Sequence, residues 1–220
     1  LYAALLKLRH PWGVREVKLD LAAERVDVWL EHAEGAKCSC PECGKTAPVY
    51  DHAEEREWRH LDTCECRTFL HARLPRVDCR AHGVRQVRPT WANPGSQFSI
   101  SFEIRVIETL RECDVTGTKR LTGTSWDEAW RIISKAVERG LARKQRRVPA
   151  CLSIDDKAFA KRHRYETLVS DRARGTVEYV ADDRTQESLE AYYRQFTIEE
   201  LTEIEAVAMD MWDPCIAATK

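Results

Sequence analysis

The sequence predicts a multidomain α+β chain with three kinds of segment in succession, and three observations support this. Apolar residues first alternate with polar ones, around cysteine pairs. From about residue 96 they recur every three to four positions, and from residue 148 strand and helix signals alternate. We therefore predict a hairpin segment (1–37), a cysteine-rich domain (38–92), a helical domain with a basic linker (96–147) and part of an α/β domain (148–220).

Composition places the chain among soluble globular proteins. Of its 220 residues, 43% are apolar and 32% are charged, and no apolar run approaches the roughly 18 residues that a membrane span needs. No signal-peptide pattern opens the sequence, so we expect a cytoplasmic protein whose nine cysteines are thiols or metal ligands. The first residue is Leu1 rather than methionine, and we expect a fragment of a longer protein.

Charge is unevenly distributed, although the net charge is −1. Residues 101–150 carry 11 basic and 7 acidic side chains, whereas residues 151–220 carry 9 and 15. A basic middle followed by an acidic end suits a DNA-binding module attached to a cation site.

The first alternating stretch predicts a β-hairpin. Val17 and Leu19 precede the polar turn at 20–25, and Val26, Val28 and Leu30 follow it at period two. This hairpin is expected to be scaffold.

Two C-x-x-C/H motifs, each followed by glycine, predict a zinc ribbon. They supply four ligands for a tetrahedral zinc ion, namely Cys40, Cys43, Cys79 and His82. Strands are expected at 56–62 and 68–77 between the motifs. We expect five further residues to be packing or surface groups rather than ligands: Cys38, Cys64, Cys66, His60 and His71.

Three helices are predicted after the turn signal at 93–96. The first runs from about Phe102 to Cys113 and the second covers 115–121. The third follows a capping box of Ser125 and Glu128 and is expected to stop at Gly140. Its predicted apolar stripe consists of Trp126, Trp130, Ile133 and Val137.

Three short helices with a glycine turn before the last predict a helix-turn-helix, although an ordinary three-helix bundle has the same pattern. Its last helix would direct Asp127, Arg131, Ser134 and Lys135 toward DNA. A basic run follows, suited to a phosphate backbone or simply to a solvated linker, and consists of Arg139, Arg143, Lys144, Arg146 and Arg147.

The last segment predicts a four-stranded sheet. Strands are expected at 150–155, 165–170, 176–180 and 206–209, with helices starting at 185 and 198, and the predicted strand order is three-two-one-four. Asp155 would close strand one and Asp210 would follow strand four, so both carboxylates would lie at adjacent strand ends. Carboxylate pairs of this kind hold Mg²⁺ in two-metal phosphodiester chemistry. Asp156, Asp182, Asp183 and Asp213 are expected to be surface or turn residues.

Seven short motifs together resemble the bacterial ISL3 insertion-sequence transposases, over nearly the whole chain. They span residues 40–44, 58–62, 76–83, 124–127, 153–159, 161–165 and 207–211. The resemblance implies a zinc finger and a helix-turn-helix that recognise terminal inverted repeats, followed by an RNase H-like DDE domain that uses Mg²⁺ for DNA cleavage and strand transfer. It assigns the first two catalytic acids to Asp155 and Asp210, and places the third, a glutamate, beyond Lys220.

The same resemblance implies self-association on double-stranded DNA at the nucleoid, with the fragment inactive alone. Two positions depart from the family pattern: Asp156 replaces a glutamate, and Cys215 stands where an aromatic residue is common. Two alternatives stay open, a DNA-binding regulator without catalysis and a structural zinc-ribbon adaptor.

Overall fold

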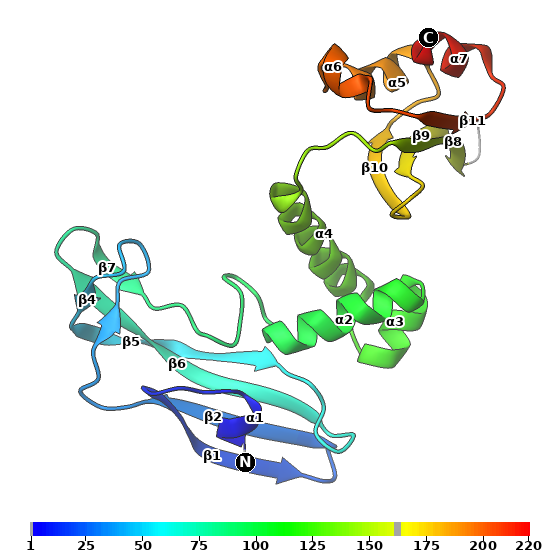
Figure 1. The fold of residues 1–220 in the computed structure, drawn as a ribbon. Coiled ribbons are helices and arrows are strands. Elements are labelled where there is room, and N and C mark those ends of the chain that lie inside the picture. The colour runs from blue at the N-terminus through cyan, green and yellow to red at the C-terminus, as the bar shows by residue number, and fades with distance from the viewer. Residues whose placement is uncertain (1, 161–163) are drawn as a thin grey trace. The chain divides into compact units, whose positions relative to one another are not determined.

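The computed structural model describes residues 2–160 and 164–220, so Leu1 and part of the 161–165 motif lie outside the described residues. The chain divides into two compact units, one ending at Arg143 and the other beginning at Lys144 (Figure 1). Each unit is described by itself.

A five-stranded sheet forms most of the first unit. Its strands are β1 (Trp12–Asp20), β2 (Arg25–His32), β5 (Val49–Arg59), β6 (Arg67–Cys79) and β7 (Gly83–Gln86), and α1 (Tyr2–Leu5) precedes them. The order is β1-β2-β6-β5, with β7 also paired to β6. β1 and β2 form the predicted hairpin, in which Val17 pairs with Val28, and β2 runs parallel to β6. Hairpin and cysteine-rich segment therefore share one sheet.

Period-two alternation explains which face of this sheet is buried. Val26, Val28 and Leu30 of β2 point to the same side as Leu70 and Leu74 of β6, and all five are nearly inaccessible. Trp12, Trp58 and Trp91 complete this core with edge-to-face ring contacts.

Three helices follow, as predicted: α2 (Ile100–Glu112), α3 (Val115–Thr122) and α4 (Trp126–Arg143). The capping box is confirmed, because Ser125 Oγ accepts the Glu128 N–H while Glu128 accepts the Ser125 N–H. The predicted stop at Gly140 is wrong. A single glycine costs a helix only about 1 kcal/mol, and the good helix formers around it carry α4 on to Arg143.

The predicted apolar stripe of α4 is largely exposed. Ala129 and Ile132 are the buried residues, whereas Trp126, Trp130 and Val137 are 50%, 59% and 51% exposed. Two apolar stripes compete on this helix, and α2 packs against the one with the small Ala129 because it allows closer approach.

Helix α2 is attached to the first sheet by backbone and side-chain contacts. Arg59 donates its N–H to Gln97 and accepts that of Ser99, the N-cap residue of α2. The Arg59 guanidinium lies 4.9 Å from the centre of the Phe102 ring. Sheet and helices therefore meet at the end of β5.

The second unit contains the predicted four-stranded sheet. Its strands are β8 (Cys151–Ala160), β9 (Arg164–Asp171), β10 (Thr176–Ala181) and β11 (Ala206–Met209). Their order, β10-β9-β8-β11, confirms the prediction, and β11 is parallel to β8. The helices are α5 (Gln186–Tyr193), α6 (Ile198–Leu201) and α7 (Asp213–Thr219). Residues of α5 and α7 pack on the sheet face that carries Leu152 and Ile154.

The predicted end of strand one at Asp155 is wrong, because β8 continues to Ala160. The extension is one arm of a hairpin in which Asp155 pairs with Leu168 and Lys157 with Glu166. Three polar residues in succession, at 155–157, interrupt the apolar alternation from which a strand is recognised. Among the described residues, no helix is long and apolar enough to cross a membrane.

Candidate functional site

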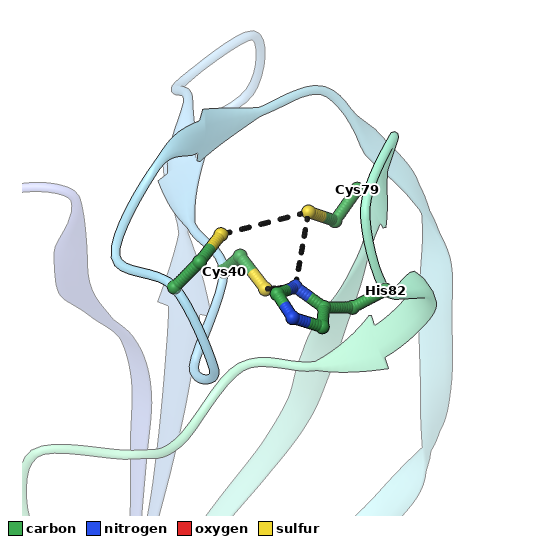
Figure 2. Close-up of side chains that lie close together, drawn as sticks. Cys40, Cys79 and His82 are labelled. Carbon is green, nitrogen blue, oxygen red and sulfur yellow. Dashed lines mark hydrogen bonds between the residues drawn. The ribbon is translucent and has the colours of Figure 1, made fainter.

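The four predicted zinc ligands converge at one end of the first sheet. A small hairpin of β3 (Cys38–Ser39) and β4 (Thr46–Ala47) supplies Cys40 and Cys43, while Cys79 ends β6 and His82 precedes β7. Their ligand atoms all lie within 4.8 Å of one another. Figure 2 shows the His82 ring pointing toward the sulfurs of Cys40 and Cys79.

The spacing of these atoms fits tetrahedral zinc. Cys43 Sγ lies 3.7 Å from Cys79 Sγ, and His82 Nδ1 lies 3.6 Å from Cys79 Sγ and 3.8 Å from Cys40 Sγ. Zn–S bonds of about 2.3 Å at tetrahedral angles separate two sulfurs by roughly 3.8 Å. The donor set therefore fits this ion.

Tight turns direct backbone amides at two of these thiols. Gly44 and Gly83 adopt the left-handed φ values of 70° and 66° that such turns require. The N–H groups of Cys43 and Glu42 lower the pKa of Cys40, and those of Ala81 and His82 lower the pKa of Cys79. Both effects favour the thiolate form that binds metal.

The spare cysteines stay outside this cluster. Cys38 is buried with its Sγ 3.0 Å from His32 Nε2, whereas Cys64 is exposed and Cys66 half-buried. Burial raises the pKa of the Cys38 thiol, so it stays protonated.

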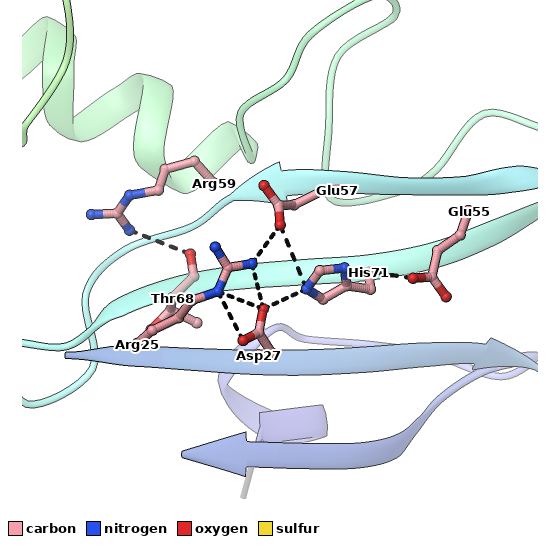
Figure 3. Close-up of polar contacts among 7 residues, drawn as sticks. All are labelled: Arg25, Asp27, Glu55, Glu57, Arg59, Thr68 and His71. Carbon is pink, nitrogen blue, oxygen red and sulfur yellow. Dashed lines mark hydrogen bonds and ion pairs between the residues drawn. The ribbon is translucent and has the colours of Figure 1, made fainter. Parts of the chain in front are cut away.

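A second polar cluster lies on the outer face of the first sheet (Figure 3). His71 Nε2 is 2.6 Å from Asp27, and the Arg25 guanidinium is 2.7 Å from Asp27 and 2.5 Å from Glu57. Hydrogen bonding to Arg25 lowers the pKa of Asp27. Arg25 thus occupies the place where a metal would neutralise the two acids, and we interpret the cluster as an ion-pair network.

The predicted DNA-contacting residues separate into two groups. Four of them are exposed on α4, namely Arg131, Lys135, Arg139 and Arg143, with Ser134 half-buried beside them. With 100° per residue, Arg131 and Ser134 lie on the side of the helix opposite Ala129 and Ile132.

The remaining basic residues do not form the predicted free run. Lys144 Nζ lies 2.8 Å from Glu178, Arg146 lies 2.7 Å from Glu200, and Arg147 pairs with the buried Asp171. Each partner acid lies more than twenty positions away. The local sequence contains no acid, so it gave no indication of these ion pairs. These three cations are bound within the second unit.

The two predicted catalytic acids lie at matching positions of neighbouring segments, Asp155 in the middle of β8 and Asp210 directly after the end of β11. Met209 pairs with Ile154 in the parallel β11–β8 ladder, so Asp210 and Asp155 occupy the next position on each chain. Neighbouring strands lie about 4.8 Å apart. Asp155 and Asp210 are both exposed, and alternation directs Asp155 away from the face that carries Ile154.

Asp156 is not the surface or turn residue that was predicted. Its side chain is only 7% exposed and binds Arg184 Nε at 2.7 Å. Thr167 Oγ1, on β9, lies 2.8 Å from the other carboxylate oxygen. Asp182, Asp183 and Asp213 are exposed, as expected. Sequence reasoning missed Arg184, a lone cation in a loop whose partner lies 28 positions away.

Comparison with known families finds three matching models in succession. The model described as the zinc-finger of transposase IS204/IS1001/IS1096/IS1165 matches residues 36–82. The helix-turn-helix domain of transposase family ISL3 matches residues 87–137, and a model described as transposase matches residues 152–220. All three models, in this order, describe domains of insertion-sequence transposases.

The chain belongs to the ISL3 family of transposases. The transposase for insertion sequence element IS1557 of Mycobacterium tuberculosis is 29% identical over 180 residues, which cover 79% of this chain and 40% of that protein. The transposase for element IS1001 of Bordetella parapertussis is 25% identical over 178 residues, with 78% and 43% covered. The chain spans about two fifths of the length of these relatives. No solved structure matches it significantly.

Proposed function

We propose that this chain recognises the terminal inverted repeats of an insertion sequence and supplies Asp155 and Asp210 to metal-dependent DNA cleavage and strand transfer. The observation that carries the proposal is the parallel β8–β11 register, which aligns two exposed carboxylates at adjacent positions. The antiparallel arm β10-β9 beside this pair supports an RNase H-like arrangement.

The two acids would hold Mg²⁺, which prefers carboxylate oxygen. When bound, the ion polarises the phosphodiester and activates water or a DNA 3′-hydroxyl. The chain's own contribution is to present Asp155 and Asp210 from neighbouring strands. The Cys40, Cys43, Cys79 and His82 cluster would hold a structural zinc ion.

DNA recognition is assigned to α4, with Arg131, Ser134 and Lys135 directed at the groove and Arg139 and Arg143 at phosphates. The DNA that the chain binds would be chromosomal, so the chain would act at the nucleoid. Transposition requires the two element ends to be brought together, and we propose that copies of the chain associate on them.

DNA binding is tested with a gel-shift titration on duplexes from both element ends. Arg131→Ala/Lys135→Ala should weaken binding and reduce its salt dependence. Arg146→Ala is the matched control, because Arg146 pairs with Glu200. Equal loss in both variants would contradict the assignment to α4.

Catalysis is tested in a protein that carries this chain at the full length of its relatives. Asp155→Ala or Asp210→Ala should abolish Mg²⁺-dependent cleavage, while Asp182→Ala, at an exposed loop acid, should not. Cleavage that survives either of the first two changes in a folded protein contradicts the proposal.

A regulator that binds DNA without catalysis is the second candidate, since the helix-turn-helix is complete within residues 100–143. Repeat binding without any metal-dependent cleavage by the full-length protein would favour it. Zinc is tested separately by elemental analysis: we expect one ion per chain, lost in Cys40→Ser/Cys43→Ser.

A further inference from the structure

We propose that Arg184 is a positioning residue that holds Asp155 and Asp210 in register for a divalent cation. This inference rests on the proposed function of the two acids. Arg184 lies in the loop between β10 and α5, and its guanidinium contacts a neighbour of each acid.

The first contact fixes the strand that carries Asp155. Arg184 Nε binds Asp156 at 2.7 Å, and Asp156 also binds Thr167, its cross-strand partner on β9. Successive residues of a strand point to opposite faces. Because Asp156 is held on the packed face, Asp155 must project from the other face.

The second contact fixes the turn after Asp210. The Arg184 guanidinium lies 4.2 Å from the centre of the Trp212 ring. Trp212 donates its backbone N–H to the Asp210 carbonyl at 2.8 Å, which closes the turn, and its ring packs against the core of the second unit. One guanidinium therefore connects both acid-bearing segments.

Charge supports the same role. Asp156 lies next to Asp155 in the sequence, and without a partner its buried carboxylate would carry a large desolvation cost on the packed face of β8. Pairing with Arg184 satisfies Asp156, which leaves Asp155 and Asp210 as the exposed pair. A planar guanidinium can bind a carboxylate through its edge while its face lies on an indole ring, which a lysine ammonium does with less defined geometry.

The test is a Mn²⁺ titration of the 220-residue chain, with free Mn²⁺ followed by electron paramagnetic resonance. Asp155→Asn identifies binding at the proposed pair. Arg184→Gln should weaken that binding about tenfold, the effect typical of lost support around metal ligands. Arg184→Lys should restore part of it. Arg194→Gln is the control, because exposed Arg194 directly follows α5 and, among the described residues, forms an ion pair only with Glu190 of that helix.

Each titration is performed well below the thermal unfolding midpoint of the variant. Unchanged Mn²⁺ affinity in folded Arg184→Gln, with binding still dependent on Asp155, overturns the positioning role alone. Wild-type binding that does not depend on Asp155 overturns the proposed metal site as well. If Arg184→Gln does not fold, Arg184→Lys decides: the proposal requires weaker binding than in the wild type, and equal affinity refutes it.

Discussion

Mild acid should weaken the attachment of α2 to the first sheet, because it protonates His60. Burial, together with the adjacent Arg59 charge, lowers the pKa of this imidazole to about 4. His60 Nδ1 lies 2.8 Å from Ser99 Oγ, which already accepts the Phe102 N–H at the start of α2. In the neutral ring with Nδ1 unprotonated, this nitrogen accepts the Ser99 hydroxyl proton, and a protonated ring no longer offers that acceptor.

The sign and size follow from proton linkage. Histidine in an unfolded chain has a pKa of about 6.5, so the unfolded state binds more protons between about pH 6.5 and pH 4. Stability is therefore lost as the pH falls through that window, and full linkage gives about 2 kcal/mol between pH 7 and pH 5. Since solvent reaches part of the ring, we expect about 1–2 kcal/mol.

The assay is urea unfolding at pH 7 and pH 5, followed by tryptophan fluorescence, because all tryptophans except Trp212 lie before Arg143. His60→Gln removes the titrating group, and exposed His52→Gln is the matched control. Carboxylates and zinc ligands respond to pH equally in every variant, so the difference between proteins isolates His60. If the wild type and His60→Gln lose the same stability on acidification, the linkage is refuted.

Three further predictions concern packing and zinc. Leu70→Ala, at a fully buried position, should cost about 2–5 kcal/mol in the same urea assay; a cost below about 1 kcal/mol would contradict the assigned core. Trp130→Ala should change the free energy of unfolding by less than about 0.5 kcal/mol, whereas Ile132→Ala should cost about 2–4 kcal/mol. A larger cost for Trp130→Ala than for Ile132→Ala would mean that the stripe predicted from sequence is the buried one. Zinc chelation should remove amide exchange protection in residues 38–47 and 79–86 but not around Leu70, because the two clusters have separate cores. Uniform loss of protection would refute that separation.

Local patterns predicted the second sheet well. Strand identity and turn signals were enough to order four strands, and the parallel placement of the last strand then brought Asp210 beside Asp155. The four-residue Cys-His cluster was predictable for a similar reason, since the spacing within each C-x-x-C/H motif determines which two side chains can bind one metal ion.

Features that depend on distant partners were not predictable. The α4 stripe was predicted from apolar residues that recur every three to four positions, but the helix buries Ala129 and leaves Trp130 exposed, and no local signal distinguishes the two faces. Asp156 was predicted to be a surface or turn residue, and Lys144, Arg146 and Arg147 were predicted to contact DNA, because the acids and cations that pair with them lie far along the chain. Ion pairs between distant residues produce no periodic pattern in a sequence from which they could be predicted.

The parallel pairing of β2 with β6 has a consequence for modular exchange. The zinc-finger match begins at residue 36, after β2 has ended, yet β2 covers one edge of β6 along residues 67–72. A piece cut at that boundary would leave this edge of β6 unpaired, with apolar Leu70 on it, and such edges recruit other chains. The finger should therefore be moved between proteins, or produced alone in soluble form, only with the preceding hairpin.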